Sequence, residues 1–157
     1  MADEKSGVSR HRILVVEDDP ARIARFREEL VNYALDVATS VEAALQLLSG
    51  PPYDLIFLDH DLEFGRRVYV DPYEANTGYQ IVKYLAQDPR YAETPIVVHS
   101  FNWFGANKMV KALPCAVYVP FGIYPIGEIA RLFFDEGLNP RMKDLGRILA
   151  SLQTGGA

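Results

Sequence analysis

The chain has 157 residues, of which 49% are hydrophobic and 24% are charged, a balance typical of one globular domain with a sizeable core. Sixteen basic and 21 acidic residues give a formal charge of −5, which argues against nucleic-acid binding as the main task of the domain. The apolar runs are too short for a membrane-spanning helix, and the polar N-terminus lacks the apolar core of a signal peptide. The single cysteine, Cys115, cannot form an internal disulfide, so we expect a cytoplasmic protein with a buried thiol.

The first predicted elements are a strand, a helix and a second strand. Ile13–Val16 is apolar, rich in β-branched residues and too short for a helix, which is typical of a strand buried on both faces. Asp19 and Pro20 then form the cap and first turn of a helix whose apolar residues recur at helical spacing up to Tyr33. A weaker run, Leu35–Ala38, predicts the second strand.

The second helix and the third strand follow the same scheme. Thr39 and Glu42 form a capping-box pattern at the start of a helix, which Gly50 and Pro51 end. Leu55–Leu58 is nearly all apolar and predicts the third strand.

The rest of the chain continues the alternation. We expect a helix opened by Thr77 and Gln80, a strand at Ile96–Val98, a helix at Ala106–Leu113, a strand at Ala116–Val119, a helix at Ile126–Phe134 and a last helix at Pro140–Leu152. Five successive βα units predict an α/β domain with a parallel sheet, helices on both faces and right-handed crossovers. We expect this domain at residues 11–136, an extra C-terminal helix within 137–153, and flexible ends at 1–10 and 154–157.

Polar side chains follow three of the predicted strands. They are Glu17, Asp18 and Asp19 after the first strand, Asp59, His60 and Asp61 after the third, and His99, Ser100 and Asn102 after the fourth. In a parallel sheet of this type the working site lies at the carboxyl edge of the strands. Carboxylates crowded together take up protons or bind a cation, and oxygen ligands favour Mg²⁺ or Mn²⁺. We therefore expect a divalent-cation site there, with Asp18 and Asp59 at its centre and Asp19 as a helix cap.

Two segments resemble response-regulator receiver domains, the flavodoxin-like modules of two-component signalling. They are Ile13-Leu-Val-Val-Glu-Asp-Asp-Pro20 and Asp54-Leu-Ile-Phe-Leu-Asp59, and the resemblance covers residues 10–136. It implies a doubly wound five-stranded parallel sheet with the strand order 2-1-3-4-5, followed here by the extra C-terminal helix.

The resemblance also implies roles for the polar residues. Glu17, Asp18, Asp59 and Asp61 would hold Mg²⁺ (or Mn²⁺), and Asp59 would accept a phosphoryl group from a histidine kinase or a small phosphodonor. Ser100 matches the hydroxyl residue that turns towards the acylphosphate. The chain would then be a single-domain response regulator in phosphorelay signalling.

Three features depart from that pattern. Receivers carry a lysine just before the proline that follows strand five, and Val119 stands there in this sequence. The aromatic switch position of strand five falls at Ala116, two positions from Tyr118. The loop at residues 62–76, between Asp59 and the third helix, is also long.

The sequence also resembles a second branch, the cyclic-phosphate-processing receiver domains, which lack the lysine. The resemblance rests on Leu58-Asp-His-Asp-Leu62, on Thr77-Gly78 and on His99-Ser-x-Asn102. It implies metal-dependent processing of cyclic phosphates or nucleotides, with a site formed by Asp59, His60, His99, Ser100 and Asn102. On this interpretation the chain is a metal-dependent cyclic phosphodiesterase.

A third interpretation is a pseudo-receiver that acts by protein–protein contact alone. The apolar stripe of the last predicted helix would cover the sheet or a second copy of the chain in a homodimer. The sequence leaves open which of the three interpretations holds, and with it the substrate, the cognate kinase and the oligomeric state. No membrane partner is expected.

Overall fold

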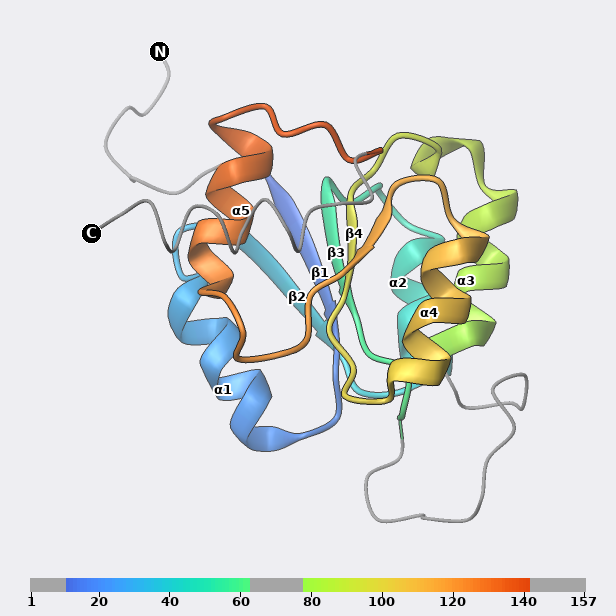
Figure 1. Ribbon diagram of the computed structural model, residues 1–157, viewed down its shortest axis with the longest axis horizontal. Coiled ribbons are helices and arrows are strands. Elements are labelled where there is room, and N and C mark those ends of the chain that lie inside the picture. Colours follow the sequence, from blue (N-terminus) through green and yellow to red (C-terminus); the bar gives the residue numbers. More distant parts are fainter. Residues whose placement is uncertain (1–10, 63–77, 142–157) are drawn as a thin grey trace.

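Five parallel strands form one sheet in the order β2-β1-β3-β4-β5, with helices on both faces (Figure 1). The computed structural model describes residues 11–62 and 78–141. The strands are β1 (Arg12–Val16), β2 (Ala34–Ala38), β3 (Leu55–Leu58), β4 (Ile96–Val98) and β5 (Ala116–Tyr118). The helices are α1 (Pro20–Glu29), α2 (Val41–Leu48), α3 (Gly78–Gln87), α4 (Trp103–Ala112) and α5 (Ile126–Phe134), with a short 3₁₀ helix, η1 (Pro89–Tyr91), before β4. The expected doubly wound topology is confirmed.

Strand β1 shows why the apolar runs are continuous. It pairs with β2 on one side and with β3 on the other. Successive side chains of a strand point to opposite faces, so Ile13 and Val15 enter one core while Leu14 and Val16 enter the other. All four are fully buried, as a strand covered on both faces requires.

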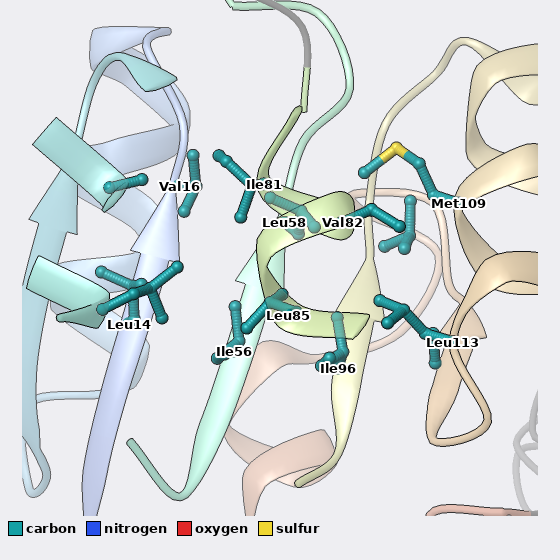
Figure 2. Packing of buried hydrophobic residues seen from close by; sticks show 14 of the residues in the cluster. Leu14, Val16, Ile56, Leu58, Ile81, Val82, Leu85, Ile96, Met109 and Leu113 are labelled. Atoms are coloured by element: carbon teal, nitrogen blue, oxygen red, sulfur yellow. The ribbon is translucent and has the colours of Figure 1, made fainter. Parts of the chain in front are cut away.

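Helices α2, α3 and α4 cover the sheet face that carries Leu14 and Val16. Figure 2 shows Ile81 and Leu85 of α3 and Met109 of α4 directed at the strands. These side chains are almost completely buried, and burying a side chain of this size contributes about 1.5–3 kcal/mol. This core fixes the start of α3 and α4 relative to the ends of β3 and β4.

Helices α1 and α5 cover the other face (Figure 1). Phe26 of α1 meets Phe57 of β3 edge to face, with ring centres 5.1 Å apart, and Ile129 and Phe133 of α5 join the same core. Within residues 11–62 and 78–141, no helix has both the length and the apolar character needed to cross a bilayer.

The helix caps agree with the sequence in one case and differ in another. Asp19 caps α1 as expected, because its Oδ1 atom accepts from the backbone N–H groups of Ala21 and Arg22 at 2.9 and 3.3 Å. The expected cap of α2, Thr39, is wrong. Ser40 has the extended backbone of an N-cap and its Oγ accepts from Ala43 N at 3.1 Å.

The fourth helix begins earlier than expected, at Trp103 rather than at Ala106. Its first turn is fixed by Asn102, whose Oδ1 atom accepts from Gly105 N at 3.0 Å. The exposed aromatic residues in that turn interrupt the apolar periodicity, so a pattern of buried positions misses it. The expected capping role of Thr77, the loop residues 63–76 and residues 142–152 of the expected last helix lie outside the described residues.

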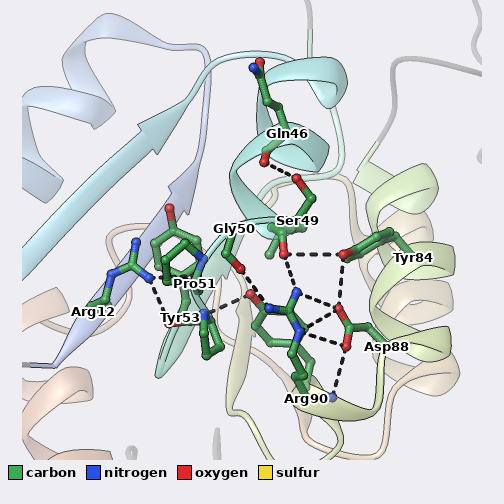
Figure 3. A network of polar contacts seen from close by, with 12 residues as sticks. Arg12, Gln46, Ser49, Gly50, Pro51, Tyr53, Tyr84, Asp88 and Arg90 are labelled. Atoms are coloured by element: carbon green, nitrogen blue, oxygen red, sulfur yellow. Dashed lines mark hydrogen bonds and ion pairs between the residues drawn. The ribbon is translucent and has the colours of Figure 1, made fainter.

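A polar network connects η1 with the end of α2 at the edge of the sheet where the strands begin (Figure 3). Arg90 donates to the carbonyl groups of Leu48 and Gly50 at 2.7 and 2.8 Å and pairs with Asp88 at 2.9 Å. These carbonyls belong to the end of α2, where helix geometry leaves them without partners. The other edge, where the strands end, carries the loops with the candidate site residues.

Candidate functional site

The sheet ladder continues for one residue past three of its strands. The backbone N–H of Asp59 donates to Val16 O at 3.1 Å, and that of His99 donates to Leu58 O at 3.1 Å. Glu17 N likewise donates to Ala38 O at 3.0 Å. The first polar residue after each strand is therefore held as firmly as the strand itself.

Glu17, Asp59 and His99 meet at this edge. One ligand atom from each lies within 4.8 Å of the others, and all three side chains are buried. The Nε2 atom of His99 lies 2.7 Å from Oε2 of Glu17. Because a carboxylate only accepts hydrogen bonds, Nε2 carries the hydrogen of this bond. The Nδ1 atom of His99 is buried with no hydrogen-bond partner in the described part of the chain.

Glu17 is held as a carboxylate by its surroundings. Its Oε1 atom accepts from the backbone N–H groups of Asp18 and Asp19 at 3.2 and 3.1 Å, and Arg22 approaches Oε2 to 3.6 Å. Burial alone would raise the pKa of Glu17, but the hydrogen bond and charge of His99, the Asp19 N–H and the charge of Arg22 hold the pKa below its ordinary value.

The pKa of Asp59 is shifted in the opposite direction from that of Glu17. Burial, supported by the nearby Glu17 carboxylate, raises the pKa of Asp59 to about 6, against the opposing effects of His99, Ser100 and Arg22. Its Oδ1 atom accepts from the backbone N–H of His60 at 2.8 Å. The pKa values of the two carboxyl groups are thus shifted in opposite directions, which is frequent at catalytic sites.

His60, Asp61 and Asn102 form a second polar group beside the first. Nδ1 of His60 lies 2.7 Å from Oδ1 of Asp61, and the Asn102 amide nitrogen lies 3.3 Å from both atoms. His60 is buried whereas Asp61 is exposed. The His60 ring packs on Gly105, where an added Cβ atom would lie only 2.5 Å from the ring. His60 therefore links the Asp59 loop to the first turn of α4.

Gly78 lets helix α3 begin against the backbone of the site. Its N–H donates to His60 O at 2.7 Å, and a Cβ atom added at Gly78 would overlap the carbonyl group of Asp59. Any larger residue would push the helix away from the loop that carries Asp59.

The structure brings the predicted residues to one edge at two depths. The buried ones, Glu17, Asp59, His60, His99 and Ser100, form the floor, and Asp18, Asp61 and Asn102 are more exposed and form the rim. Asp18 and Asp61 do not belong to the group of ligand atoms within 4.8 Å that the described residues form.

Two residues at the site were not expected from the sequence. Arg22 pairs with Glu17, and its guanidinium lies over the ring of Phe101 at 4.3 Å from the ring centre. Tyr118, which lies two positions from the expected aromatic position, donates from its hydroxyl to Ser100 O at 2.8 Å. The position of Arg22 in the first turn of the helix after Glu17 is the one signal that the sequence offers for it.

The donor set suits a hard or borderline divalent cation. Two carboxylates and one imidazole are ligands that Mg²⁺, Mn²⁺ and related ions accept. Ligands on opposite sides of such an ion lie about 4 Å apart, which is close to the 4.8 Å limit that encloses these three atoms. Glu17 and Asp59 offer the oxygen atoms of this set, and His99 offers its nitrogen.

The profile of the cyclic-phosphate processing receiver domain matches residues 12–114. This range includes every site residue that was expected from the sequence, from Glu17 to Asn102. The chain belongs to this receiver family. A comparison with curated proteins found no match.

Solved response regulators share the fold of this receiver. The phosphorylated cyanobacterial phytochrome response regulator RcpA is 18% identical, with a TM-score of 0.64 over 84% of this chain and 99% of RcpA. The Mn²⁺-bound response regulator Rcp1 is 19% identical, with a TM-score of 0.62 over 82% of this chain and 96% of Rcp1. TrrA from Thermotoga maritima, solved with Mg²⁺ and BeF, is 22% identical, with a TM-score of 0.58 over 77% of this chain and 96% of TrrA. At such identities the likeness shows the fold alone.

Proposed function

We propose that this receiver processes cyclic phosphate esters in a divalent-cation-dependent reaction centred on Asp59. The observation that carries the proposal is the buried group of Glu17, Asp59 and His99 at the carboxyl edge of the sheet. Val119 stands where a relay receiver would carry a lysine, so the position that contacts the acylphosphate in relay receivers carries no cation here. His99 instead holds a second buried carboxylate, Glu17, beside Asp59. Two carboxylates without that lysine favour the processing of a phosphate ester over a phosphoryl relay.

Asp59 and Glu17, with Asp18 and Asp61 from the rim, are the residues that we expect to hold the cation. The Mn²⁺ in Rcp1 and the Mg²⁺ in TrrA support a divalent ion in this fold. When bound, the ion would neutralise charge on the phosphate oxygens and lower the pKa of a water molecule.

The residues of the chain then have separate tasks. Asp59, buried at the centre of the site, accepts a proton from the attacking water. The water oxygen forms a bond to phosphorus, the ester P–O bond breaks, and the alkoxide takes a proton from solvent at the rim. His99 acts through Glu17, whose carboxylate it holds in place. Asn102, on the rim, donates from its amide to a non-bridging phosphate oxygen.

Hydrolysis of adenosine 2′,3′-cyclic monophosphate with Mn²⁺ or Mg²⁺, followed by ³¹P NMR, tests the proposal. Asp59→Asn should remove turnover, with a loss of at least about 100-fold, and His99→Gln should reduce it. Arg90→Ala, at the opposite edge of the sheet (Figure 3), is the matched control and should keep full turnover. The proposal fails if wild type is inactive on both 2′,3′- and 3′,5′-cyclic nucleotides, or if Asp59→Asn is as active as wild type.

A second function has one observation in its favour. Asp59 lies at the end of β3 in a receiver fold, where phosphoryl transfer to a carboxylate needs positioning and charge neutralisation more than a strong base. RcpA, which shares this fold, was solved in a phosphorylated form. Incubation with acetyl phosphate and Mg²⁺, followed by intact-mass measurement, tests it. A phosphoryl adduct on wild type that is absent from Asp59→Asn would assign Asp59 as a phosphoacceptor.

A further inference from the structure

Three aromatic side chains are exposed directly beside the site. Phe101, Trp103 and Phe104 are 61%, 66% and 57% exposed, and they occupy three of the four positions after Ser100. Residues 11–62 and 78–141 contain five strongly exposed large apolar side chains, and these three are the ones that lie together in the sequence. A concentration of this kind marks a binding surface.

Cationic groups flank this aromatic surface. The guanidinium of Arg22 lies 4.3 Å from the ring centre of Phe101, and the Lys108 ammonium lies 4.8 Å from that of Phe104. Arg22 also approaches the Glu17 carboxylate to 3.6 Å. The same arginine therefore contacts the floor of the site and the first ring of the surface.

We propose that Phe101, Trp103 and Phe104 form a stacking surface for the base of a nucleotide whose phosphate lies at Asp59. The inference rests on the proposed function, which it deepens by naming the substrate class. Flat heterocycles stack on aromatic side chains and on arginine planes, and both are present here. Arg22 and Lys108 add positive charge for a ligand that carries a phosphate.

The ligand that suits this surface is small. The formal charge of −5 opposes the binding of a long polyanion, whereas a single nucleotide presents one base and one phosphate. The position of the rings supports this size, because Phe101 directly follows Ser100 and Trp103 directly follows Asn102. A mononucleotide and the terminal nucleotide of a strand share this chemistry.

The emission of Trp103 provides the readout, because it is the only tryptophan of the chain. We would titrate the full chain in Mg²⁺ with adenosine 2′,3′-cyclic monophosphate, with adenosine, and with the base-free ester glycerol 1,2-cyclic phosphate. The two adenine ligands should quench the emission. Phe101→Ala and Phe104→Ala should each weaken binding of the cyclic nucleotide by about 5- to 100-fold. Binding of the base-free ester, which has no base to quench Trp103 and is followed by calorimetry, should be unchanged. Val31→Ala, which removes an exposed side chain after α1, is the matched control and should bind like wild type.

Equal nucleotide affinity in wild type, Phe101→Ala and Phe104→Ala would overturn the inference. The inference would also be overturned if wild type bound the base-free ester as tightly as the nucleotide, or if the aromatic surface bound a protein and no nucleotide. A short strand that ends in a cyclic phosphate and binds more tightly than the mononucleotide would assign the surface to strand ends. Binding of the adenine ligands through these rings, with neither 2′,3′- nor 3′,5′-cyclic nucleotide hydrolysed, would support the stacking surface and refute the proposed function. Hydrolysis that is equal in wild type, Phe101→Ala and Phe104→Ala would support the proposed function and refute the stacking surface.

Discussion

The Nε2 atom of His99 lies 2.7 Å from Oε2 of Glu17, and both side chains are almost completely buried. Glu17 follows β1 and His99 follows β4, the two strands that flank β3. Their hydrogen bond thus joins the ends of β1 and β4, the strands on either side of β3, which Asp59 directly follows. A buried carboxylate needs such a partner, because charge taken out of water without one is costly.

His99→Ala should lower the free energy of unfolding by about 3 kcal/mol, because it leaves the Glu17 carboxylate buried without its main partner. Urea denaturation at neutral pH measures this change. Glu17→Gln combined with His99→Ala should be more stable than His99→Ala alone, since the buried charge is then gone. Arg25→Ala, which breaks the exposed pair with Glu29, is the control and should change stability little. The interpretation is refuted if His99→Ala is no less stable than the Arg25 variant.

Asp59→Asn should stabilise the protein at pH 8. The folded chain holds the Asp59 proton up to a pKa of about 6, whereas the ordinary value is 3.8. Between these values the folded state binds more protons than the unfolded state, so stability falls as the pH rises through this window. Above pH 6 the ionised Asp59 lowers the free energy of unfolding by about 3 kcal/mol. Below pH 3.8 this loss is absent, because Asp59 is protonated in both states.

The measurement is the free energy of unfolding of wild type and Asp59→Asn at pH 8 and at pH 4. We expect the variant to be more stable by about 1–3 kcal/mol at pH 8, and the advantage should shrink towards pH 4. Asp135→Asn, at an exposed position after α5, is the matched control. An advantage of the same size at both pH values would contradict the assigned cause.

The fold was largely predictable because its signals are local. Short β-branched runs and helix-period segments alternate along the chain, and the strands were expected within one residue of their observed ends. The caps were less predictable. Thr39 and Ser40 are adjacent residues of similar capping strength, and only the backbone conformation selects Ser40.

The site was predictable as a set of strand ends but not as a set of contacts. The sequence places Glu17, Asp59 and His99 at one edge, because the topology does so. It does not show that His99 pairs with Glu17 rather than with Asp59, since side-chain direction depends on packing. Tyr118 was missed for the same reason, because its hydroxyl reaches from β5 to the Ser100 carbonyl after the neighbouring strand β4.

Gly105→Ala should destabilise the protein by about 1–3 kcal/mol, although alanine favours a helix over glycine. The added Cβ atom would lie 2.5 Å from the His60 ring, so the ring or the first turn of α4 must move. Thermal denaturation of Gly105→Ala, His60→Ala and the double variant measures the effect. The double variant should lose less stability than the sum of the two single variants.

Gly50→Ala is the control for this series, because a Cβ atom there makes only an ordinary contact of 3.4 Å with Leu47 O. It should leave stability nearly unchanged. If the losses from Gly105→Ala and His60→Ala simply add, the contact between the two residues is not the cause.

Mn²⁺ should stabilise wild type and leave Asp59→Asn unaffected. A ligand that binds only the folded state at 100 times its Kd raises the free energy of unfolding by about 2.7 kcal/mol, and this site loses a central oxygen donor in the variant. Without metal the variant is expected to be the more stable protein at pH 8, because the Asp59 carboxylate is costly there. Addition of Mn²⁺ should therefore narrow or reverse the order of the two melting temperatures, and EDTA should restore it. Equal shifts in both proteins would place the bound ion elsewhere and remove Asp59 from the cation site.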